Sequence, residues 1–220
     1  MDNKKVKGYA YGVIASVSYG LNPLFALPLY ASGIRVDSVL FYRYVFALLF
    51  LAVMMKMSGQ SFALKRNEIL PVAVMGLLFS FSSLFLFQSF NYMDAGIAST
   101  ILFMYPVLVA VIMAVFFKER LSVVKIASIA TAFVGISMLY KGEGGATLSM
   151  TGVCLVLMSS LTYALYIVGV NRSSLKEMPG LKLTFYAILF GSLVYIVRLG
   201  GGFDDETPET VANFLGLATG

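Results

Sequence analysis

The sequence from residue 69 to residue 117 reads ILPVAVMGLLFSFSSLFLFQSFNYMDAGIASTILFMYPVLVAVIMAVFF. Its only charged side chain is Asp94, and the three residues Asn91, Tyr92 and Met93 divide it into two apolar runs. Each run exceeds the roughly 20 residues that an α-helix needs to cross a ~30 Å hydrocarbon core. A turn this short makes the two helices antiparallel neighbours. The stretch therefore predicts a membrane-spanning helical hairpin over 69–90 and 94–117.

The rest of the chain has the same character. Of its 220 residues, 59% are hydrophobic and 12% are charged, whereas soluble domains carry about 25% charged residues. A nucleic-acid-binding domain, a secreted disulfide scaffold and a soluble enzyme are therefore all disfavoured. An eighth apolar segment begins near Val211, and five further runs long enough to span a bilayer lie at 8–29, 38–57, 122–140, 150–170 and 181–199. The sequence predicts an all-α polytopic membrane protein with the lipid bilayer as its surroundings.

Several kinds of chemistry lack the residues they need. Histidine is absent and Cys154 is the only cysteine, which removes histidine-based metal centres, Ser/His/Asp catalysis and intramolecular disulfides. We expect no metal, no cofactor and a buried Cys154 that acts as a small hydrophobic residue. A membrane-embedded enzyme, such as a lipid-modifying transferase, needs clustered carboxylates, histidines or a basic headgroup pocket at one interface. The sequence displays none of these, so we expect no enzymatic activity.

The basic residues fall mainly in alternate loops. With the N-terminus inside, twelve of the 16 Lys and Arg residues lie on the inner side; Arg35, Lys141 and Arg198 lie outside, and Arg43 lies within a span. The inner set is Lys4, Lys5, Lys7, Lys56, Lys65, Arg66, Lys118, Arg120, Lys125, Arg172, Lys176 and Lys182. Because cytoplasmic loops carry the excess of Lys and Arg, we predict a multi-pass protein of the cell (inner) membrane with a cytoplasmic N-terminus.

Three short patterns of residues occur twice in the sequence, at nearly the same spacing. Gly8, Ser16, Tyr19 and Leu21 recur at an offset of 144 as Gly152, Ser160, Tyr163 and Leu165. Ala47, Leu49 and Phe50 recur at an offset of 140 as Ala187, Leu189 and Phe190, and Gly76-Leu77 recurs as Gly216-Leu217. These matches indicate a five-helix repeat over 1–145 and a partial second copy over 146–220. An odd number of helices inverts the second copy, so two full copies make a ten-helix bundle. We therefore expect the chain to be truncated after about 7.5 helices, roughly 60–80 residues short of two full copies.

The most specific motif joins the fourth and fifth predicted spans. It consists of AGIASTILFMYPVLV at 95–109 followed by FFKERLS at 116–122. With Tyr19-Gly20-Leu21-Asn22, Arg43 and the late glycine Gly135, this motif closely resembles the EamA-type drug/metabolite transporters. The resemblance implies a ten-helix bundle of two inverted repeats that moves small metabolites, commonly outward.

Polar and aromatic side chains inside the spans are the candidate substrate contacts. Tyr19, Asn22, Gln88, Tyr105 and Tyr163 are expected to line the substrate site, although helix packing or local backbone bonding explains each of them as well. Arg43 would anchor a carboxylate or phosphate, or its side chain would extend to the membrane surface. Ser80 and Ser83 share one helix face, whereas Ser82 lies on another.

Prolines are expected to bend two of the spans. Pro23 and Pro106 each remove one backbone hydrogen bond, so each is either a gating bend or a static kink. Asp94 stands where an acidic residue caps a helix N-terminus.

The function predicted from these features is secondary transport by alternating access. The predicted substrate is a small metabolite that the protein exports, such as an amino acid, a nucleoside or a drug-like compound. An inactive fragment or a non-transporting membrane subunit is the alternative, and a membrane-embedded enzyme ranks last. No nucleic acid is expected as a partner, and a homodimer is compatible with the sequence. No Asp, Glu or His lies in the middle of a span. Coupling therefore resides in further helices, is absent because transport is facilitated, or depends on a residue such as Arg43.

Overall fold

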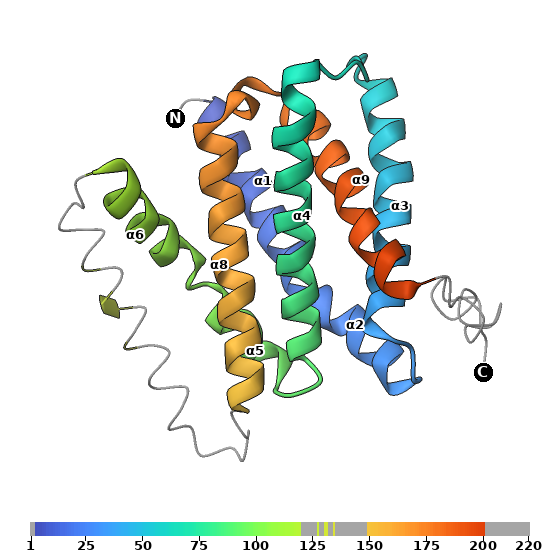
Figure 1. Cartoon of the computed structure of the whole chain (residues 1–220), viewed down its shortest axis with the longest axis vertical. Coiled ribbons are helices and arrows are strands. Elements are labelled where there is room, and N and C mark those ends of the chain that lie inside the picture. The colour runs from blue at the N-terminus through green and yellow to red at the C-terminus, as the bar shows by residue number, and fades with distance from the viewer. Residues whose placement is uncertain (1–2, 120–126, 128–129, 132–133, 135–148, 201–220) are drawn as a thin grey trace. The chain divides into compact units, whose positions relative to one another are not determined.

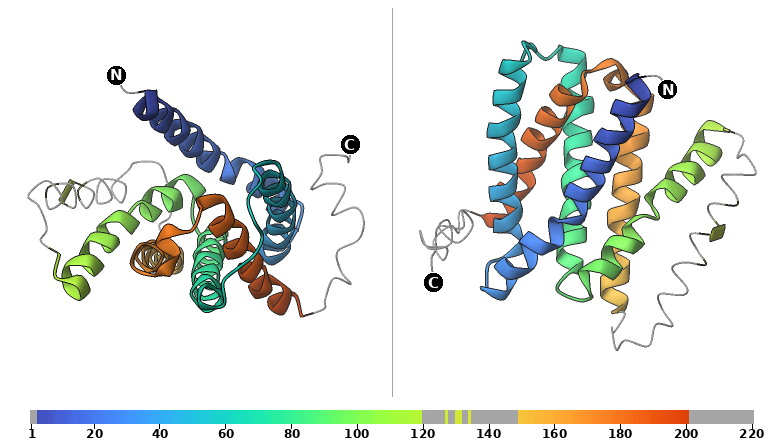
Figure 2. Two further views of the ribbon diagram at one scale, coloured as in Figure 1. Left: turned by 90° about the horizontal axis from the view of Figure 1, so that it is seen from above. Right: turned by 180° about the vertical axis from the view of Figure 1, so that it is seen from behind.

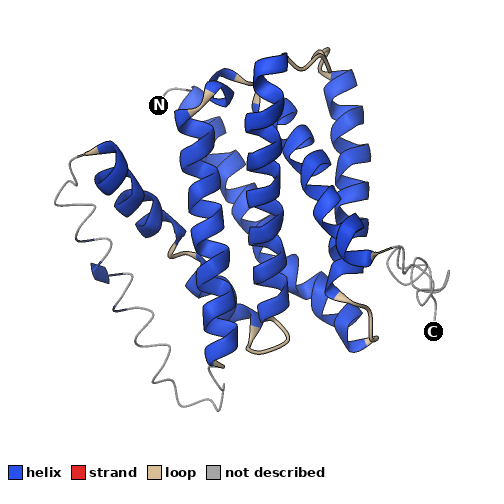
Figure 3. Cartoon of the chain, viewed as in Figure 1, coloured by secondary structure: helices blue, strands red, loops and turns tan. Residues whose placement is uncertain are grey.

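The computed structural model describes residues 3–119, 127, 130–131, 134 and 149–200. Every regular element among these residues is a helix (Figure 3), which confirms the all-α prediction. The described residues divide into two units, one formed by residues 3–35 and the other by the described residues from 36 to 200. Each unit is described separately below.

The second unit contains five helical stretches that are long and apolar enough to cross a membrane, within the described residues. They confirm the predicted spans at 38–57, 69–90, 94–117, 150–170 and 181–199. The helices are α3 (Val36–Met57), α4 (Arg66–Ser89), α5 (Ala95–Leu102), α6 (Tyr105–Phe117), α8 (Met150–Arg172) and α9 (Gly180–Leu199), with the short 3-10 helix η1 (Ser174–Glu177) between the last two. Most of the predicted span 122–140 lies outside the described residues.

The first unit contains the predicted span 8–29 as two helices rather than one. They are α1 (Asn3–Gly20) and α2 (Asn22–Ala31), and they meet at Leu21. Pro23 lies in the first turn of α2, where its missing N–H costs little. The bend expected at Pro23 is therefore present, and neither helix is among the five membrane-spanning stretches.

Helix α4 is the centre of the second unit. It packs against α8 on one side and α9 on another, while α3 packs against α9 and the α5–α6 pair packs against α8. Figures 1 and 2 show α3, α4, α8 and α9 running side by side from two directions. Segments more than 100 residues apart in sequence thus form one bundle.

Two glycines bring the backbones of α4 and α9 close together. A Cβ atom on Gly76 would lie 2.5 Å from the carbonyl oxygen of Ala187. A Cβ atom on Gly191 would lie 2.0 Å from Oγ of Ser80 and 2.8 Å from the carbonyl oxygen of Gly76. In a bilayer, helices associate through close packing rather than through the hydrophobic effect. The α4–α9 interface therefore depends on these two missing side chains.

The basic residues of separate loops gather at one end of the bundle, which we call the basic end. Its described members are Lys56, Lys65, Arg66, Lys118, Arg172, Lys176 and Lys182. Contacts between loops hold this end together: the Tyr186 hydroxyl donates to the Phe62 carbonyl oxygen, and Arg172 contacts Glu119 at 3.5 Å. Helix α6 also ends here. Its C-cap residue is Lys118, whose φ of 52° lies in the left-handed region that favours glycine.

The start of α5 is capped as the sequence predicts. The Asp94 side chain accepts hydrogen bonds from the amides of Gly96 at 2.8 Å and Ile97 at 3.1 Å, which confirms its predicted capping role.

The prediction that Cys154 is buried was wrong, because this residue is exposed on the surface of α8. A thiol needs no buried site, since sulfur is only weakly polar.

An ion pair joins α3 to α9 at the end opposite the basic end. Arg198 Nε lies 2.7 Å from Oδ1 of Asp37, and its Nη2 lies 3.2 Å from Oδ2. The Asp37 side chain is 6% exposed and that of Arg198 is 44% exposed. A two-pronged guanidinium–carboxylate contact of this kind is stronger than a single one, and it fixes two helices that are far apart in the sequence.

We expect the change Arg198→Met to lower the free energy of unfolding by about 1–3 kcal/mol, because it leaves the Asp37 carboxylate buried without its guanidinium. The value is below the range for fully buried pairs because Arg198 is half-exposed. The double change Asp37→Asn with Arg198→Met should recover part of the loss, since no buried charge remains. Thermal unfolding in detergent measures the stability of the single and the double variant.

The control Arg172→Met removes a contact between two half-exposed side chains and should cost under about 1 kcal/mol. Equal losses for Arg198→Met and Arg172→Met would contradict this account of the pair.

Candidate functional site

The predicted span 94–117 is broken where Pro106 was expected to bend it. Helix α5 ends at Leu102 and α6 begins at Tyr105, with Pro106 in its first turn. In a continuous helix the N–H of residue 106 would bond to the carbonyl of Leu102, and proline has no N–H to offer. The Leu102 carbonyl instead faces α8, where Oγ of Ser160 lies 3.2 Å from it. Ser160 is thus positioned to supply the donor that Pro106 lacks.

The single hydroxyl proton of Ser160 has two acceptors, because its Oγ also lies 2.9 Å from the carbonyl oxygen of Val156. If it serves the Leu102 carbonyl, Ser160→Ala should destabilise the protein by about 1 kcal/mol. The matched control is Ser192→Ala, whose hydroxyl donates only to Leu189 within its own helix. Melting temperatures in detergent decide the matter. A Ser160→Ala variant no less stable than the Ser192→Ala variant would show that the bend does not depend on Ser160.

An aromatic row crosses the second unit just beyond this bend. We define the aromatic row as Tyr105, Tyr163, Tyr166, Phe79, Tyr44 and Tyr195. Ring centroids of successive members lie 4.8 Å apart for Tyr105–Tyr163, 5.9 Å for Tyr163–Tyr166, 5.4 Å for Tyr166–Phe79, 6.4 Å for Phe79–Tyr44 and 4.9 Å for Tyr44–Tyr195. Five helices, α6, α8, α4, α3 and α9, each contribute at least one ring. Most of these rings lie near the middle of the spans that carry them.

The row has a closed end at Tyr44 and Tyr195. Both residues are buried, with 6% and 0% of their surface exposed. Ser80 Oγ donates to the Tyr44 hydroxyl at 3.1 Å, and that hydroxyl donates to Ser83 Oγ at 3.4 Å. The Tyr195 hydroxyl donates to the Ser80 carbonyl oxygen at 2.9 Å. Every polar atom at this end is satisfied, as burial requires, and the predicted shared face of Ser80 and Ser83 is confirmed.

Ser82 lies on a different face of α4, as predicted, and joins α4 to α8. Its Oγ donates to the Ser159 carbonyl oxygen at 3.0 Å, while Ser159 Oγ donates to the Ser82 carbonyl oxygen at 2.7 Å. This reciprocal pair is buried and fixes the register of the two helices that carry the middle of the aromatic row.

The other end of the row is open. Tyr105, Tyr163 and Tyr166 are half-buried, and their hydroxyls form no hydrogen bond with any residue that the structure describes. A phenol inside an apolar span normally finds a partner when it is buried. These three rings carry stacking faces and hydroxyls without a partner among the described residues, and a site for a small organic molecule uses groups of this kind.

The structure brings two of the predicted substrate contacts together and separates others from them. Tyr105 and Tyr163 form an edge-to-face pair with an interplanar angle of 82°. Arg43 lies over a different ring, with its guanidinium carbon 4.7 Å from the centroid of Phe87, so it makes a cation–π contact. Gln88 is half-buried near the end of α4.

The other two predicted contacts belong to the first unit. Asn22 is the half-buried first residue of α2. Tyr19 lies in α1, and its side chain is outside the described part of the structure.

Sequence reasoning missed four members of the aromatic row: Tyr44, Phe79, Tyr166 and Tyr195. The sequence does contain a sign of Tyr166. It stands three residues after Tyr163, and residues at this spacing share a helix face. Tyr44 directly follows Arg43, and the sequence favoured the charged residue of the two as a substrate contact. Phe79 gave no signal, because α4 contains several phenylalanines on all of its faces.

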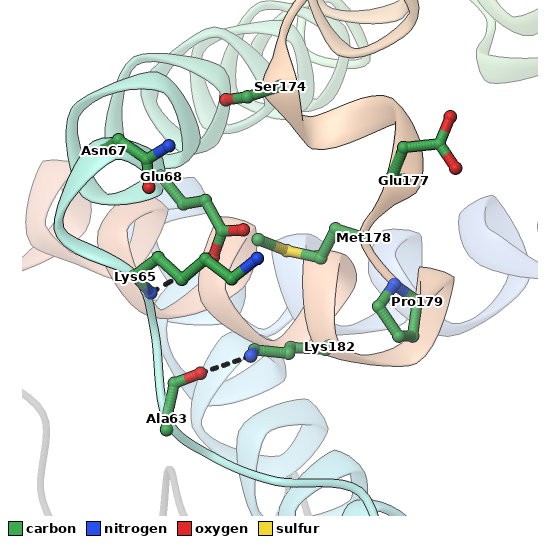
Figure 4. Close-up of a pocket in the computed structure, with 9 residues that line it drawn as sticks. All are labelled: Ala63, Lys65, Asn67, Glu68, Ser174, Glu177, Met178, Pro179 and Lys182. Carbon is green, nitrogen blue, oxygen red and sulfur yellow. Dashed lines mark hydrogen bonds between the residues drawn. The ribbon is translucent and has the colours of Figure 1, made fainter.

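A separate cavity of about 450 Å³ lies at the basic end. Residues 63–68, η1 and the start of α9 line it, and it contains no member of the aromatic row (Figure 4). No group of three or more His, Cys, Asp or Glu with metal-binding geometry occurs in the part of the chain that the structure describes.

A family model describes most of the membrane-embedded sequence. The model of the EamA-like transporter family matches residues 6–141, which is more than half of the chain. The chain belongs to the EamA-like transporter family. The resemblance carried by residues 95–109 and 116–122 is thereby confirmed, and this EamA-like chain is a multi-pass membrane protein of a transporter family.

Curated relatives of this EamA-like chain are also named as transporters. The uncharacterized transporter YxxF of Bacillus subtilis is 29% identical over 131 residues, covering 57% of this chain and 42% of the relative. An uncharacterized transporter of Archaeoglobus fulgidus is 28% identical over 102 residues, or 46% of this chain and 36% of the relative. YvbV of Bacillus subtilis is 25% identical over 150 residues, or 67% of this chain and 48% of the relative. The chain thus matches less than half the length of each of these relatives. No solved structure matches it.

Proposed function

We propose that this EamA-like chain exports a small organic metabolite by alternating access, with the open end of the aromatic row as its substrate site. The observation that carries the proposal is the pairing of Tyr105 with Tyr163 near the middle of two spans, with hydroxyls that have no partner among the described residues. Transporter sites lie near the bilayer midplane beside broken helices. Here the break between α5 and α6 directly precedes Tyr105.

The class of substrate follows from what the row offers. Aromatic faces bind flat rings by stacking and organic cations by cation–π contact. No charged side chain contacts Tyr105, Tyr163 or Tyr166 among the described ion pairs and ring contacts. An amino acid, a nucleoside or a drug-like compound with a ring or a cationic group suits this site. We retain Tyr19, Asn22, Arg43 and Gln88 as proposed contacts for the substrate's polar groups.

The repeat organisation is part of the proposal. The inverted halves would be 1–145 and 146–220, and the family model's match at 6–141 supports the position of the boundary. The aromatic row draws Tyr105, Phe79 and Tyr44 from the first half and Tyr163, Tyr166 and Tyr195 from the second. A row that crosses the boundary would open when one half rocks against the other, with the bends at Pro23 and Pro106 as gating points.

The orientation we propose puts the basic end in the cytoplasm. The gathering of Lys and Arg at that end supports this choice, because the positive-inside rule sets the direction of insertion. The protein would then lie in the inner membrane with a cytoplasmic N-terminus, as a monomer or a homodimer, and without enzymatic activity.

The function is tested by comparing metabolites inside and outside cells of the native host. Three strains are needed: one with the gene deleted, one with the gene restored, and one restored with the double variant Tyr105→Ala and Tyr163→Ala. We expect at least one ring-bearing or cationic metabolite to accumulate inside the deletion strain and to appear in the medium only when the unchanged gene is restored. Identical profiles in all three strains would contradict the proposal and favour a non-transporting subunit. Quantifying each protein in the membrane excludes differences in expression.

A further inference from the structure

The cavity at the basic end has a lining that the transport proposal does not use. Its volume is about 450 Å³. Two segments that are more than 100 residues apart in sequence enclose it (Figure 4), with α4 beginning on one side and α9 on the other. The lining residues are Ala63, Lys65, Asn67, Glu68, Ser174, Glu177, Met178, Pro179 and Lys182.

Neither of the two ammonium groups in this cavity forms an ion pair with a described acidic residue, although Glu68 also lines the cavity. Lys65 forms no ion pair there, and Lys182 Nζ donates only to the backbone carbonyl of Ala63. Ser174 and Asn67 are exposed, and their side chains form no hydrogen bond with another described residue. Ammonium groups and neutral donors are the kinds of side-chain group that bind phosphate.

The cavity also presents a carboxylate. Glu68 accepts a hydrogen bond from the Lys65 backbone amide at 3.1 Å, and Figure 4 shows its carboxylate beside the Lys65 side chain, facing the interior. Glu177 is at the rim, with its carboxylate turned outward in the same view. The interior therefore carries both signs of charge, which matches a zwitterion better than a simple anion.

The residues around the cavity are of the kinds found where membrane spans meet water. Phe62 precedes Ala63 of the lining and is 43% exposed, and its ring lies 5.7 Å from that of Phe185. The Tyr186 hydroxyl donates to the Phe62 carbonyl oxygen. Aromatic rings together with lysines at the ends of spans mark the interface between hydrocarbon and water. A ligand in this position would have its polar part in the cavity and its apolar part along exposed aromatic side chains.

We propose that this cavity binds the headgroup of a zwitterionic phospholipid of the phosphatidylethanolamine type. Lys65 and Lys182 hold the phosphate, Glu68 holds the ammonium group, and the acyl chains lie outside against Phe62. Basic pockets between membrane-spanning helices on the cytoplasmic side bind lipid headgroups in other proteins. The sequence displayed no headgroup pocket, because its residues come from two separate loops that only the fold brings together.

The test is native mass spectrometry of the purified, delipidated chain with phosphatidylethanolamine, phosphatidylglycerol or phosphatidylcholine added in turn. We expect phosphatidylethanolamine to be retained preferentially. The double variant Lys65→Gln and Lys182→Gln should weaken its binding about tenfold, whereas Lys176→Gln, which removes a charge at the same end but outside the cavity, should leave binding unchanged. Melting temperatures of both variants establish that they are folded, and single substitutions at Lys65 and Lys182 replace the double variant if it is not.

Three results would overturn the proposal. Equal retention of phosphatidylglycerol would show attraction by charge alone, without recognition of the ammonium group. Unchanged binding in the double variant and in both single variants would place the lipid elsewhere. Competition by glycerophosphoethanolamine or inorganic phosphate at concentrations equal to that of the lipid would identify a free phosphate compound as the ligand. None of these outcomes depends on transport, so the proposal can fail while the transport function stands.

Discussion

Replacing Gly191 with leucine should abolish the folded protein in the membrane. A Cβ atom at this position already lies 2.0 Å from Oγ of Ser80 and 2.8 Å from the carbonyl oxygen of Gly76. The Ser80 side chain is also a member of the hydrogen-bonded group at the closed end of the aromatic row. The larger side chain would push α9 away from α4, and in lipid no hydrophobic effect opposes the separation. Size-exclusion chromatography of a fluorescent fusion measures the amount of folded protein.

The smaller change Gly191→Ala should destabilise the protein by about 1–3 kcal/mol, the usual cost of forcing extra volume into a packed interface. Gly180→Ala is the matched control, since it also adds one methyl group to α9 but meets no atom within 4 Å. If Gly191→Ala and Gly180→Ala have the same melting temperature, α4 and α9 do not pack as closely as described.

The second large effect is expected on transport rather than on folding. Tyr105→Ala or Tyr163→Ala should reduce efflux of the exported compound at least tenfold, because stacking on one aromatic ring contributes about 0.5–1.5 kcal/mol beyond surface burial and each change also breaks the ring pair. Folding should change little, since both rings are half-buried and their hydroxyls bond to no described residue. Efflux rates at equal protein amounts provide the measurement.

Conservative changes separate the two parts of each side chain. Tyr163→Phe retains the stacking face and removes only the hydroxyl, so a rate near that of the unchanged protein would assign the role to the ring. Tyr92→Ala is the control, because Tyr92 is an exposed tyrosine in the loop between α4 and α5. If Tyr105→Ala and Tyr163→Ala transport as fast as Tyr92→Ala, the aromatic row is not the substrate site.

Five of the predicted spans, the bend at Pro106 and the Asp94 cap were predictable, because each depends on local chemistry. Membrane spans follow from length and apolar composition. A proline always removes its own hydrogen bond, and an acidic residue before a helix accepts the free amides that follow it. These features need no knowledge of what packs against the helix.

Partner choice between helices was not predictable in the same way. Helices α3 and α4 do not have an apolar face opposite a polar one, so periodicity does not show which side meets another helix. Asp37 and Arg198 are 161 residues apart, and each stands at the end of a span where a charge has an ordinary topological explanation. Gly191 and Ser80 look like any small residues in a membrane helix until the fold places them together. The aromatic row depends on this same arrangement of five helices.

The most direct test of the account asks whether the aromatic row is reached from both sides of the membrane. Cysteine is placed at position 105 or 163 in a background in which the exposed Cys154 is replaced by serine. Each variant is then labelled with a membrane-impermeant maleimide in right-side-out and in inverted vesicles. Met55→Cys, at a fully buried position, is the control for no labelling, and Tyr92→Cys and Ser58→Cys report the two faces. Alternating access predicts labelling at both 105 and 163 from either side, whereas labelling of neither position from either side would contradict it.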